Sequence, residues 1–299
     1  MMLMSLTRVG RLAAVGLPAT MLHAASGMAG EGRASDWQIG LQEAATPVAE
    51  QMHNFHNLLL VIVTIIVILV MGLIGWVMFR YNAAANPEPS KNSHNTVLEV
   101  AWTVVPVLIL LVIAIPSFRL LYAQYDAPKA DLTIKVTGHQ WYWSYNYPDS
   151  GGFGFDSLRV PDAELKEGQP RLLAVDNEVV VPVNKVVHML LTADDVIHNW
   201  AMPSFGLKMD AVPGRNHLAW FRATEPGIYY GQCSELCGRD HAFMPIAVRV
   251  VSEQDFGAWI EQAKQKFASS MPEPVKAAAA AHASADEPAG GMLASAERN

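Results

Sequence analysis

The sequence predicts an α+β membrane protein in which a two-helix transmembrane hairpin precedes a β-sandwich or β-barrel. Only 16% of its 299 residues are charged, whereas a soluble domain carries about a quarter. Two long apolar segments lie in the first half of the chain, and short strand-like segments separated by turns follow them. That second texture is typical of a sandwich or barrel.

The first 29 residues have the order of a secretory signal peptide. Arg8 and Arg11 precede an apolar stretch, Leu12 to Leu22, and small residues cluster after it. Basic, apolar and small residues in that order are typical of a signal that is removed. A flexible hydrophobic N-terminus is the alternative. The signal predicts that residues 30–57 form a segment on the periplasmic side of the membrane.

The hairpin is predicted over residues 58–121. Residues 58–79 are 22 consecutive residues without a charge, and about 20 apolar residues span a bilayer. A second span, residues 97–121, contains Pro106, Pro116 and one acid, Glu99. If the signal peptide places the N-terminus outside, the loop between the spans is cytoplasmic and the rest of the chain is outside.

Residues 126–267 are expected to form the outer domain. Its turns are marked by sequences such as Pro213-Gly214 and Pro226-Gly227. The strands are expected near residues 132–137, 141–147, 171–175, 178–182, 186–192, 218–222, 227–230 and 246–251. Residues 252–267 have the pattern of an amphipathic helix with a serine N-cap. Residues 268–299, rich in Ala, Pro, Glu and Ser, are expected to be disordered.

The only two cysteines, Cys233 and Cys237, lie four residues apart. This count excludes a disulfide-dense scaffold and a four-cysteine metal site. His241 and Met244 follow closely, and His198 precedes them. Thiolate, imidazole and thioether ligands favour copper. Two cysteines on one loop can bridge two copper ions, each with one histidine and one weaker ligand. Met244 and the backbone carbonyl of Glu235 would serve as the weaker ligands.

Three other sites remain open from these residues alone. A structural zinc ion held by two cysteines and two histidines leaves Met244 unexplained. A disulfide between the cysteines and a site with a single copper ion are the others. The formal net charge of −7 argues against a nucleic-acid partner, because such proteins carry a basic surface.

The chain resembles subunit II of cytochrome c oxidase in its bacterial form. The resemblance covers about residues 42–267. It rests on the two spans, the segment Gly138-His-Gln-Trp-Tyr-Trp-Ser-Tyr145, the stretch around His198, Gly206-Leu-Lys-Met-Asp210, Pro213-Gly-Arg215 and the cysteine loop. The two spans separate it from nitrous-oxide reductase, and the complete ligand set separates it from quinol-oxidase subunits. A membrane-tethered copper-delivery protein is the alternative.

The family implies a cupredoxin-like β-barrel whose dinuclear copper centre is bound by His198, Cys233, Glu235, Cys237, His241 and Met244. It implies an enzyme complex in the bacterial inner membrane, with the copper domain in the periplasm. Cytochrome c would be the electron donor, and subunits I and III would be partners. The haems would lie only in the partner, since no Cys-x-x-Cys-His is present here. Oxygen reduction in subunit I is coupled to proton pumping in this family.

The family also implies roles for further residues. Trp141 would receive electrons, although strand aromatics alone indicate core packing. Glu99 would mark the mouth of a proton channel, or be an ordinary interfacial acid. The Glu235 carboxylate would bind magnesium or manganese shared with subunit I, or be a solvated loop acid. Cytochrome c would dock on four acids, namely Asp156, Asp176, Asp194 and Asp195. Asn146 stands where the family commonly has another acid.

Overall fold

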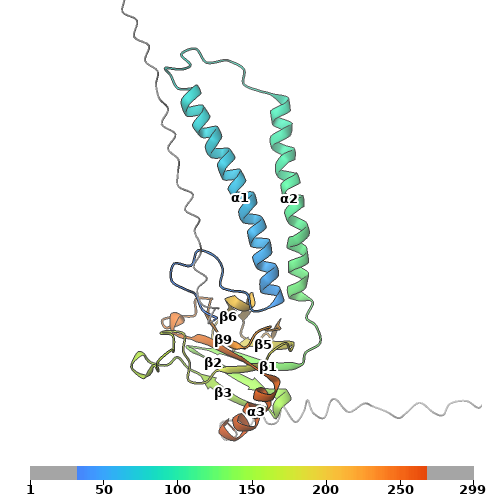
Figure 1. Cartoon of the computed structure of the whole chain (residues 1–299), viewed down its shortest axis with the longest axis vertical. Helices are drawn as coiled ribbons and strands as arrows, with labels where there is room; N and C mark the ends of the chain where they lie inside the picture. The colour runs from blue at the N-terminus through green and yellow to red at the C-terminus, as the bar shows by residue number, and fades with distance from the viewer. Residues whose placement is uncertain (1–31, 268–299) are drawn as a thin grey trace, which may run out of the picture.

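The computed structural model describes residues 32–267 of the chain. It consists of two long helices and a β-domain (Figure 1). This architecture confirms the predicted fold class. The predicted signal peptide, residues 1–29, and the predicted disordered tail, residues 268–299, lie outside the described residues.

The hairpin is formed by α1 (Pro47–Arg80) and α2 (Thr96–Tyr125). The two helices run antiparallel, and the β-domain lies against the beginning of α1 and the end of α2 (Figure 1). Asn95 caps α2 by accepting hydrogen bonds from the backbone N–H groups of Val97 and Leu98, at 3.1 and 3.2 Å. Both helices are long and apolar enough to cross a membrane, because about 20 residues suffice.

The start of α1 is tied to the β-domain by hydrogen bonds. Thr46 caps the helix by accepting from the Ala49 N–H at 3.0 Å, and its hydroxyl donates to the Phe205 carbonyl at 2.8 Å. The Ala45 N–H donates to the Ser204 carbonyl at 2.8 Å, and the Thr224 N–H donates to the Ala45 carbonyl at 3.0 Å. The helix therefore meets the β-domain without a flexible linker.

Within residues 32–267, ten strands form two five-stranded sheets, with the orders β3-β2-β1-β5-β8 and β4-β10-β9-β6-β7. The strands are β1 Leu132–His139, β2 Tyr142–Tyr147, β3 Phe153–Ser157, β4 Val179–Pro182, β5 Val187–Ala193, β6 His198–Met202, β7 Leu207–Ala211, β8 His217–Phe221, β9 Gly227–Cys233 and β10 Pro245–Val251. The short helices are η1 Pro148–Ser150, η2 Asp162–Glu164, η3 Pro203–Phe205 and η4 His241–Phe243, and α3 is Glu253–Phe267.

The core between the sheets is rich in aromatic side chains from β2. Trp143, Tyr145 and Tyr147 are at most 1% exposed. Alternation along a strand sends every second residue to the same face, so these three share the core face. The Tyr147 hydroxyl donates to the Val180 carbonyl at 3.0 Å, which satisfies its polar end. Core packing therefore accounts for these three residues, and Trp141, which precedes the strand, is partly buried and packs against the same core.

The structure differs from the sequence predictions in one predicted strand that is a loop and in three strands that were not predicted. The strand expected at residues 171–175 is wrong, because only Val175 forms a single bridge, to Arg159. Leu172 has a φ of 67°, which breaks an extended strand. The sequence prediction missed β3, β6 and β7. All five residues of β6 are buried, so that strand lacks the alternation by which strands are recognised.

Candidate metal centre

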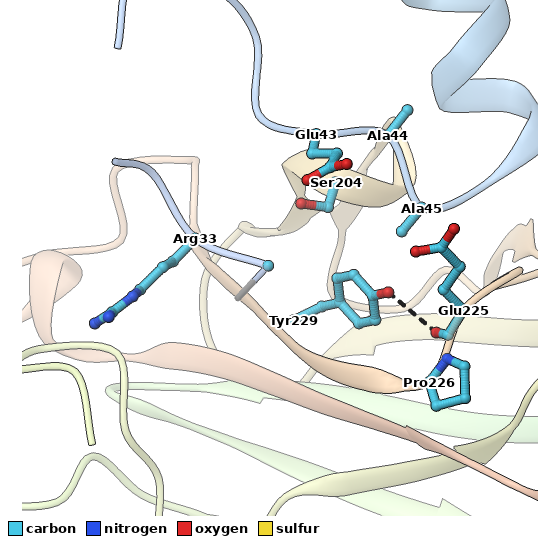
Figure 2. Close-up of a pocket in the computed structure, with 9 residues that line it drawn as sticks. Arg33, Glu43, Ala44, Ala45, Ser204, Glu225, Pro226 and Tyr229 are labelled. Atoms are coloured by element: carbon cyan, nitrogen blue, oxygen red, sulfur yellow. Dashed lines mark hydrogen bonds between the residues drawn. The ribbon is translucent and has the colours of Figure 1, made fainter. Parts of the chain in front are cut away.

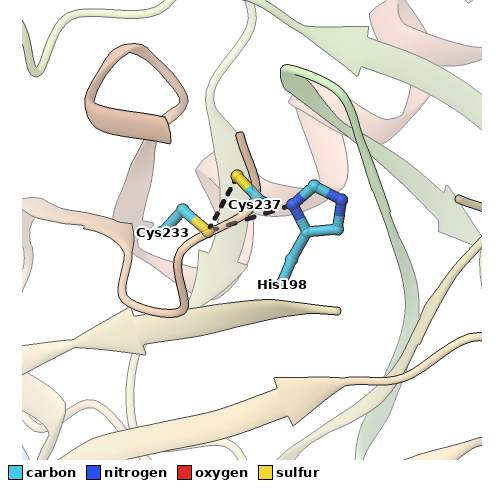
Figure 3. Close-up of side chains that lie close together, drawn as sticks. All are labelled: His198, Cys233 and Cys237. Carbon is cyan, nitrogen blue, oxygen red and sulfur yellow. Dashed lines mark hydrogen bonds between the residues drawn. The ribbon is translucent and has the colours of Figure 1, made fainter. Parts of the chain in front are cut away.

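The cysteine loop connects β9 to β10 and lies beside the beginning of β6. Cys233 is the last residue of β9, and η4 carries His241 within the loop. Antiparallel pairing sets Trp200 of β6 opposite Cys233, which brings His198 to the loop. Figure 3 shows the His198 ring beside the two cysteine side chains. His198 and Cys233, 35 positions apart in sequence, therefore meet because β6 begins beside the place where β9 ends.

The soft ligands predicted from the sequence converge at this loop. The Sγ atoms of Cys233 and Cys237 lie 3.9 Å apart, and His198 Nδ1 lies 3.9 Å from the Cys233 sulfur. His241 Nδ1 and Met244 Sδ each lie 3.5 Å from the Cys237 sulfur. The ligand atoms of His198, Cys233 and Cys237 all lie within 4.8 Å of one another. This donor set, two thiols with imidazole and thioether, fits copper.

Neither cysteine is in a disulfide in the structure. Their sulfur separation of 3.9 Å is well beyond the S–S bond length of about 2.05 Å. Each sulfur has a different imidazole as its neighbour. The backbone carbonyl of Glu235 lies 3.4 Å from the Cys233 sulfur.

The two thiols differ in acidity. Burial, together with the neighbouring Cys233, raises the pKa of Cys237 to about 12. Burial also raises the pKa of Cys233, but hydrogen bonds with His198 and with nearby backbone groups outweigh it, so the net pKa is lowered. Because thiolates are the metal ligands, a bound cation must displace the Cys237 proton.

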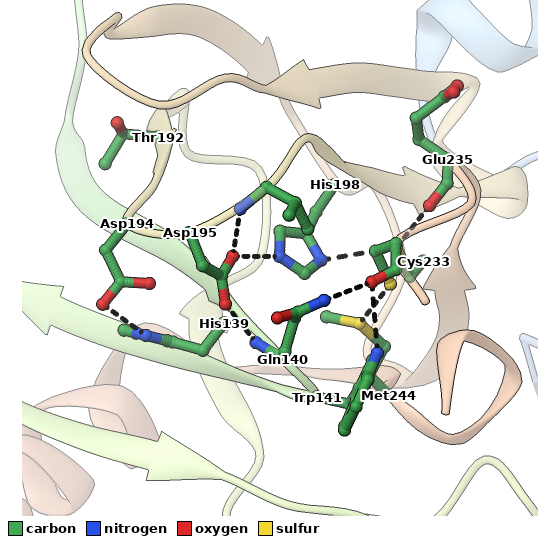
Figure 4. Close-up of polar contacts among 12 residues, drawn as sticks. His139, Gln140, Trp141, Thr192, Asp194, Asp195, His198, Cys233, Glu235 and Met244 are labelled. Carbon is green, nitrogen blue, oxygen red and sulfur yellow. Dashed lines mark hydrogen bonds and ion pairs between the residues drawn. The ribbon is translucent and has the colours of Figure 1, made fainter. Parts of the chain in front are cut away.

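Asp195 fixes the orientation of His198. Its Oδ1 lies 2.8 Å from His198 Nε2, so Nδ1 faces the cysteines. Its Oδ2 accepts from the Gln140 N–H at 2.6 Å. Burial raises the pKa of Asp195, but the bonds from His198 and from two backbone N–H groups outweigh it and lower that pKa. A carboxylate behind a ligand histidine is a common support for a metal site, and Figure 4 shows this arrangement.

The turn between β1 and β2 closes over the loop. The Gln140 amide donates to the Cys237 carbonyl at 2.7 Å, and the Trp141 indole N–H donates to the same oxygen at 3.3 Å. Gly138, just before this turn, leaves room for the His198 ring, since a Cβ there would lie 2.8 Å from its Cδ2 atom. Trp141 is half-buried and in direct contact with a ligand residue.

Arg239 and Asp240 are features of this site that sequence reasoning missed. The Arg239 guanidinium lies over the Trp141 ring, 5.3 Å from its centroid. It also forms an ion pair with Asp240 at 2.8 Å. The preceding Gly238 has a φ of 126°, and this left-handed backbone favours glycine. No spacing in the sequence reveals the contact, because Arg239 and Trp141 are almost a hundred positions apart.

The four predicted docking acids are placed differently from one another. Asp194 is 58% exposed and pairs with His139 at 2.9 Å, whereas Asp195 is only 28% exposed and serves His198. Asp156 accepts from the Ser144 hydroxyl at 2.6 Å. Asp176 accepts from the Leu158 N–H at 2.8 Å. All four therefore have hydrogen-bonding partners within the chain.

The two predicted functional glutamates lie in separate places. The Glu235 carboxylate is exposed and points away from the sulfur atoms in Figure 4. Glu99 lies in the first turn of α2, at the end of the hairpin far from the β-domain (Figure 1). Its carboxylate accepts from the Asn95 N–H at 3.3 Å, so it also contributes to the helix cap.

Cavities of about 150, 190 and 280 Å³ lie where the N-terminal segment and α1 meet the β-domain. Figure 2 shows the first of these, where the Tyr229 hydroxyl donates to the Glu225 carbonyl at 3.0 Å. The cysteines and histidines of the metal centre do not line any of these three cavities. The chemistry of the described residues is therefore concentrated at the cysteine loop.

Comparison with known proteins identifies two family domains in the chain. Residues 132–251 match "Cytochrome C oxidase subunit II, periplasmic domain", and residues 34–120 match "Cytochrome C oxidase subunit II, transmembrane domain". The chain is 53% identical over 242 residues to a probable cytochrome c oxidase subunit 2 of Rickettsia felis, covering 81% of this chain and 76% of that protein.

Two further proteins with similar sequences are also described as subunit II of a cytochrome oxidase. The cytochrome c oxidase subunit 2 of Cereibacter sphaeroides is 45% identical over 250 residues, covering 78% of this chain and 82% of that one. The solved periplasmic domain of subunit II of cytochrome oxidase of Bradyrhizobium japonicum is 62% identical, covering 47% of this chain and 99% of that one, with a TM-score of 0.45. On the family matches and the relatives' identity, the chain belongs to the cytochrome c oxidase subunit II family.

Proposed function

We propose that this chain is the electron-accepting subunit of a bacterial cytochrome c oxidase. It receives electrons from cytochrome c at a dinuclear copper centre and passes them to haem and copper sites in subunit I, where oxygen is reduced to water and protons are pumped. The observation that carries the proposal is the pair of free, buried cysteine sulfurs 3.9 Å apart, each with its own imidazole neighbour.

The ligands of the proposed centre come from one loop and one strand. Cys233 and Cys237 would bridge the two metal ions, and His198 and His241 would bind one each. Met244 and the Glu235 carbonyl would supply the weaker ligands. Two copper ions that share two thiolates accept and release one electron with little movement of their ligands. The site is suited to electron relay because the side chains of His198, Cys233, Cys237 and Met244 are buried.

Three residues extend this function toward partners. Trp141 is proposed as the position where electrons from cytochrome c arrive, supported by its hydrogen bond to the Cys237 carbonyl. The exposed Glu235 carboxylate is proposed to bind magnesium or manganese together with subunit I, since hard cations take oxygen ligands. Glu99 is proposed to mark the mouth of a proton channel that continues through subunit I, because acids in spans are often functional.

The proposed location is the bacterial inner membrane, with the copper domain in the periplasm and residues 81–95 on the cytoplasmic side. The two apolar helices support membrane insertion. The predicted signal peptide supports the orientation. Subunits I and III are the proposed membrane partners, and lipid surrounds the remaining surface of the hairpin.

The test is electron paramagnetic resonance of the oxidised, copper-loaded full chain in detergent. One unpaired electron shared by two equivalent copper nuclei gives seven hyperfine lines. Four lines would mean a mononuclear site and would refute the dinuclear centre, and so would elemental analysis that finds zinc or one copper ion per chain. Cys233→Ser should abolish the seven-line pattern.

A second measurement separates an oxidase subunit from a copper-delivery protein. Affinity purification of the full chain from its own membranes should bring down a haem-containing partner. A chain that binds two copper ions but purifies without haem would favour the delivery role.

A further inference from the structure

The most unusual contact beside the metal centre is the guanidinium of Arg239 on the Trp141 ring. The 5.3 Å distance to the ring centroid is within the range of a cation–π interaction. The Arg239 side chain is nevertheless 80% exposed. An incoming protein that touches Trp141 from outside therefore meets this guanidinium as well.

Arg239 is held in this position from two sides. Asp240, 34% exposed, binds its Nη2 atom at 2.8 Å and its Nε atom at 3.2 Å. Below it, Trp141 is fixed by the bond from its indole N–H to the Cys237 carbonyl. A bidentate ion pair and a stacked ring together orient the planar guanidinium. The free N–H groups on its outer side remain available to an acceptor.

The acids nearest to the turn of Trp141 are engaged with other groups. Asp194 pairs with His139, and Asp195 with His198 and the Gln140 N–H. The surface around Trp141 thus combines paired acids with the stacked guanidinium of Arg239, rather than forming a uniformly acidic patch.

We propose that Arg239 is a specificity-determining residue for the electron donor. Its guanidinium favours a donor that brings a carboxylate or a carbonyl oxygen to the centre of the contact, and it disfavours a donor that brings a lysine there. This inference rests on the proposed role of Trp141 as the position where electrons arrive. Because Arg239 is exposed and complementary charges steer the encounter of two partners, we expect the effect in the second-order rate constant.

The test uses two small reductants of opposite charge with the assembled, copper-loaded oxidase. Hexaammineruthenium(II) is cationic, and the iron(II) complex of EDTA is anionic. Reduction of the copper centre is followed optically by stopped flow at low ionic strength. Arg239→Gln should increase the rate of reduction by the ruthenium complex and decrease the rate of reduction by the iron complex, each by roughly two- to five-fold. Both differences should shrink at high salt, because the Debye length falls to about 3 Å at 1 M.

Two variants serve as controls. Arg239→Lys keeps the positive charge and should leave both rates near those of the unmodified oxidase. Lys264→Gln removes an equivalent charge from α3, where Lys264 pairs with Glu261, and should leave both rates unchanged. A seven-line spectrum in each variant shows that the metal centre is intact.

The outcomes separate this inference from the proposed function. Rates that change in the same direction for both reductants mean that Arg239 acts on the geometry of Trp141, which overturns the specificity role. Rates that do not change for Arg239→Gln also overturn it, while reduction of the unmodified centre leaves the proposed function standing. A copper centre that neither reductant reduces would contradict the proposed function itself.

Discussion

At the scale of single residues, the carbonyl oxygen of Cys237 connects the ligand loop to its surroundings. It accepts hydrogen bonds from the side chains of both Gln140 and Trp141. On the other side, Asp195 joins the same turn to His198 through the Gln140 N–H. Two ligands of the centre are therefore oriented by one turn, so substitutions in that turn affect the metal without touching it.

Replacing Asp195 by asparagine should weaken copper binding by about 10- to 100-fold, because a carboxylate that orients a ligand histidine typically contributes that much. Competition with a copper chelator measures the affinity. The matched control is Asp194→Asn, at the more exposed neighbouring acid that pairs with His139, which should leave the affinity within about two-fold. Equal losses in the two variants would contradict the positioning role of Asp195.

Trp141→Phe should slow electron transfer from cytochrome c by at least about ten-fold, which corresponds to about 1.4 kcal/mol in the barrier. The phenyl ring retains an aromatic surface but lacks the N–H that reaches the Cys237 carbonyl. The copper spectrum should change little, because Trp141 supplies no ligand atom and the Gln140 amide still donates to the Cys237 carbonyl. Normal transfer in this variant would remove Trp141 from the proposed path.

At the scale of elements, β2 separates buried from partly exposed aromatic residues. Trp143 is fully buried, and its indole N–H donates to the Met244 carbonyl at 3.3 Å. Tyr142 faces outward and stacks on His139 with ring centroids 4.4 Å apart. Burial raises the pKa of Tyr142 first, and the charges of Asp156, Asp194 and Asp195 raise it further. The hydroxyl of Tyr142 thus stays neutral at physiological pH.

Trp143→Ala should lower the free energy of unfolding of the metal-free chain by about 3–5 kcal/mol, the range for deleting a fully buried aromatic side chain. Tyr142→Ala should lower it by less than about half as much, since that side chain is half-buried. Chemical denaturation of the full chain in detergent measures both. A smaller loss for Trp143 than for Tyr142 would mean that the core has been assigned to the wrong face of β2.

Substitutions in and before the first turn of α2 can separate helix capping from the proposed role of Glu99 in proton entry. Glu99→Gln keeps an oxygen for the Asn95 N–H but removes the charge, so it should slow turnover of the assembled oxidase while the copper spectrum stays intact. Asn95→Ala removes the cap, which costs about 1 kcal/mol, and should leave turnover close to normal. Turnover that falls only in the Asn95 variant would identify Glu99 as a capping residue alone.

At the scale of the whole molecule, the outer domain carries a modest excess of acids. Residues 126–267 contain 18 acids and 13 bases, a net charge of −5. Attraction to a cationic donor by such a field is screened by salt. The rate of reduction by cytochrome c should therefore fall from low to physiological ionic strength, as measured by stopped flow. A rate that stays flat over that range would contradict electrostatic docking.

Much of the architecture follows from the sequence. The unbroken apolar run of residues 58–79 predicts a spanning helix by length alone, and α1 extends beyond it on both sides. The ligand types and their spacing around Cys233 and Cys237 predict a copper site without any knowledge of the fold. His198 is predicted as a ligand only because the set of ligands resembles known copper sites and the chain resembles the family. No local sequence pattern joins His198 to the loop.

The rest required the three-dimensional structure. Sequence alternation cannot find β6, because both of its faces are buried. The second role of Asp195, behind His198, depends on how the loop after β5 folds back. The contact between Arg239 and Trp141 joins two turns that are distant in sequence, and no local propensity encodes it.

The hydrogen bonds made by residues 45–46 fix how far the metal centre lies from the membrane. The Thr46 side chain both caps the first helix and donates a hydrogen bond to the β-domain. The distance between the metal centre and the bilayer is therefore fixed by the fold. The rate of electron tunnelling decays exponentially with the distance between donor and acceptor. A rigid connection between the first helix and the β-domain keeps the distance from the metal centre to an acceptor in the membrane constant. Inserting a few flexible residues at this connection would let that distance fluctuate while every ligand stays in place.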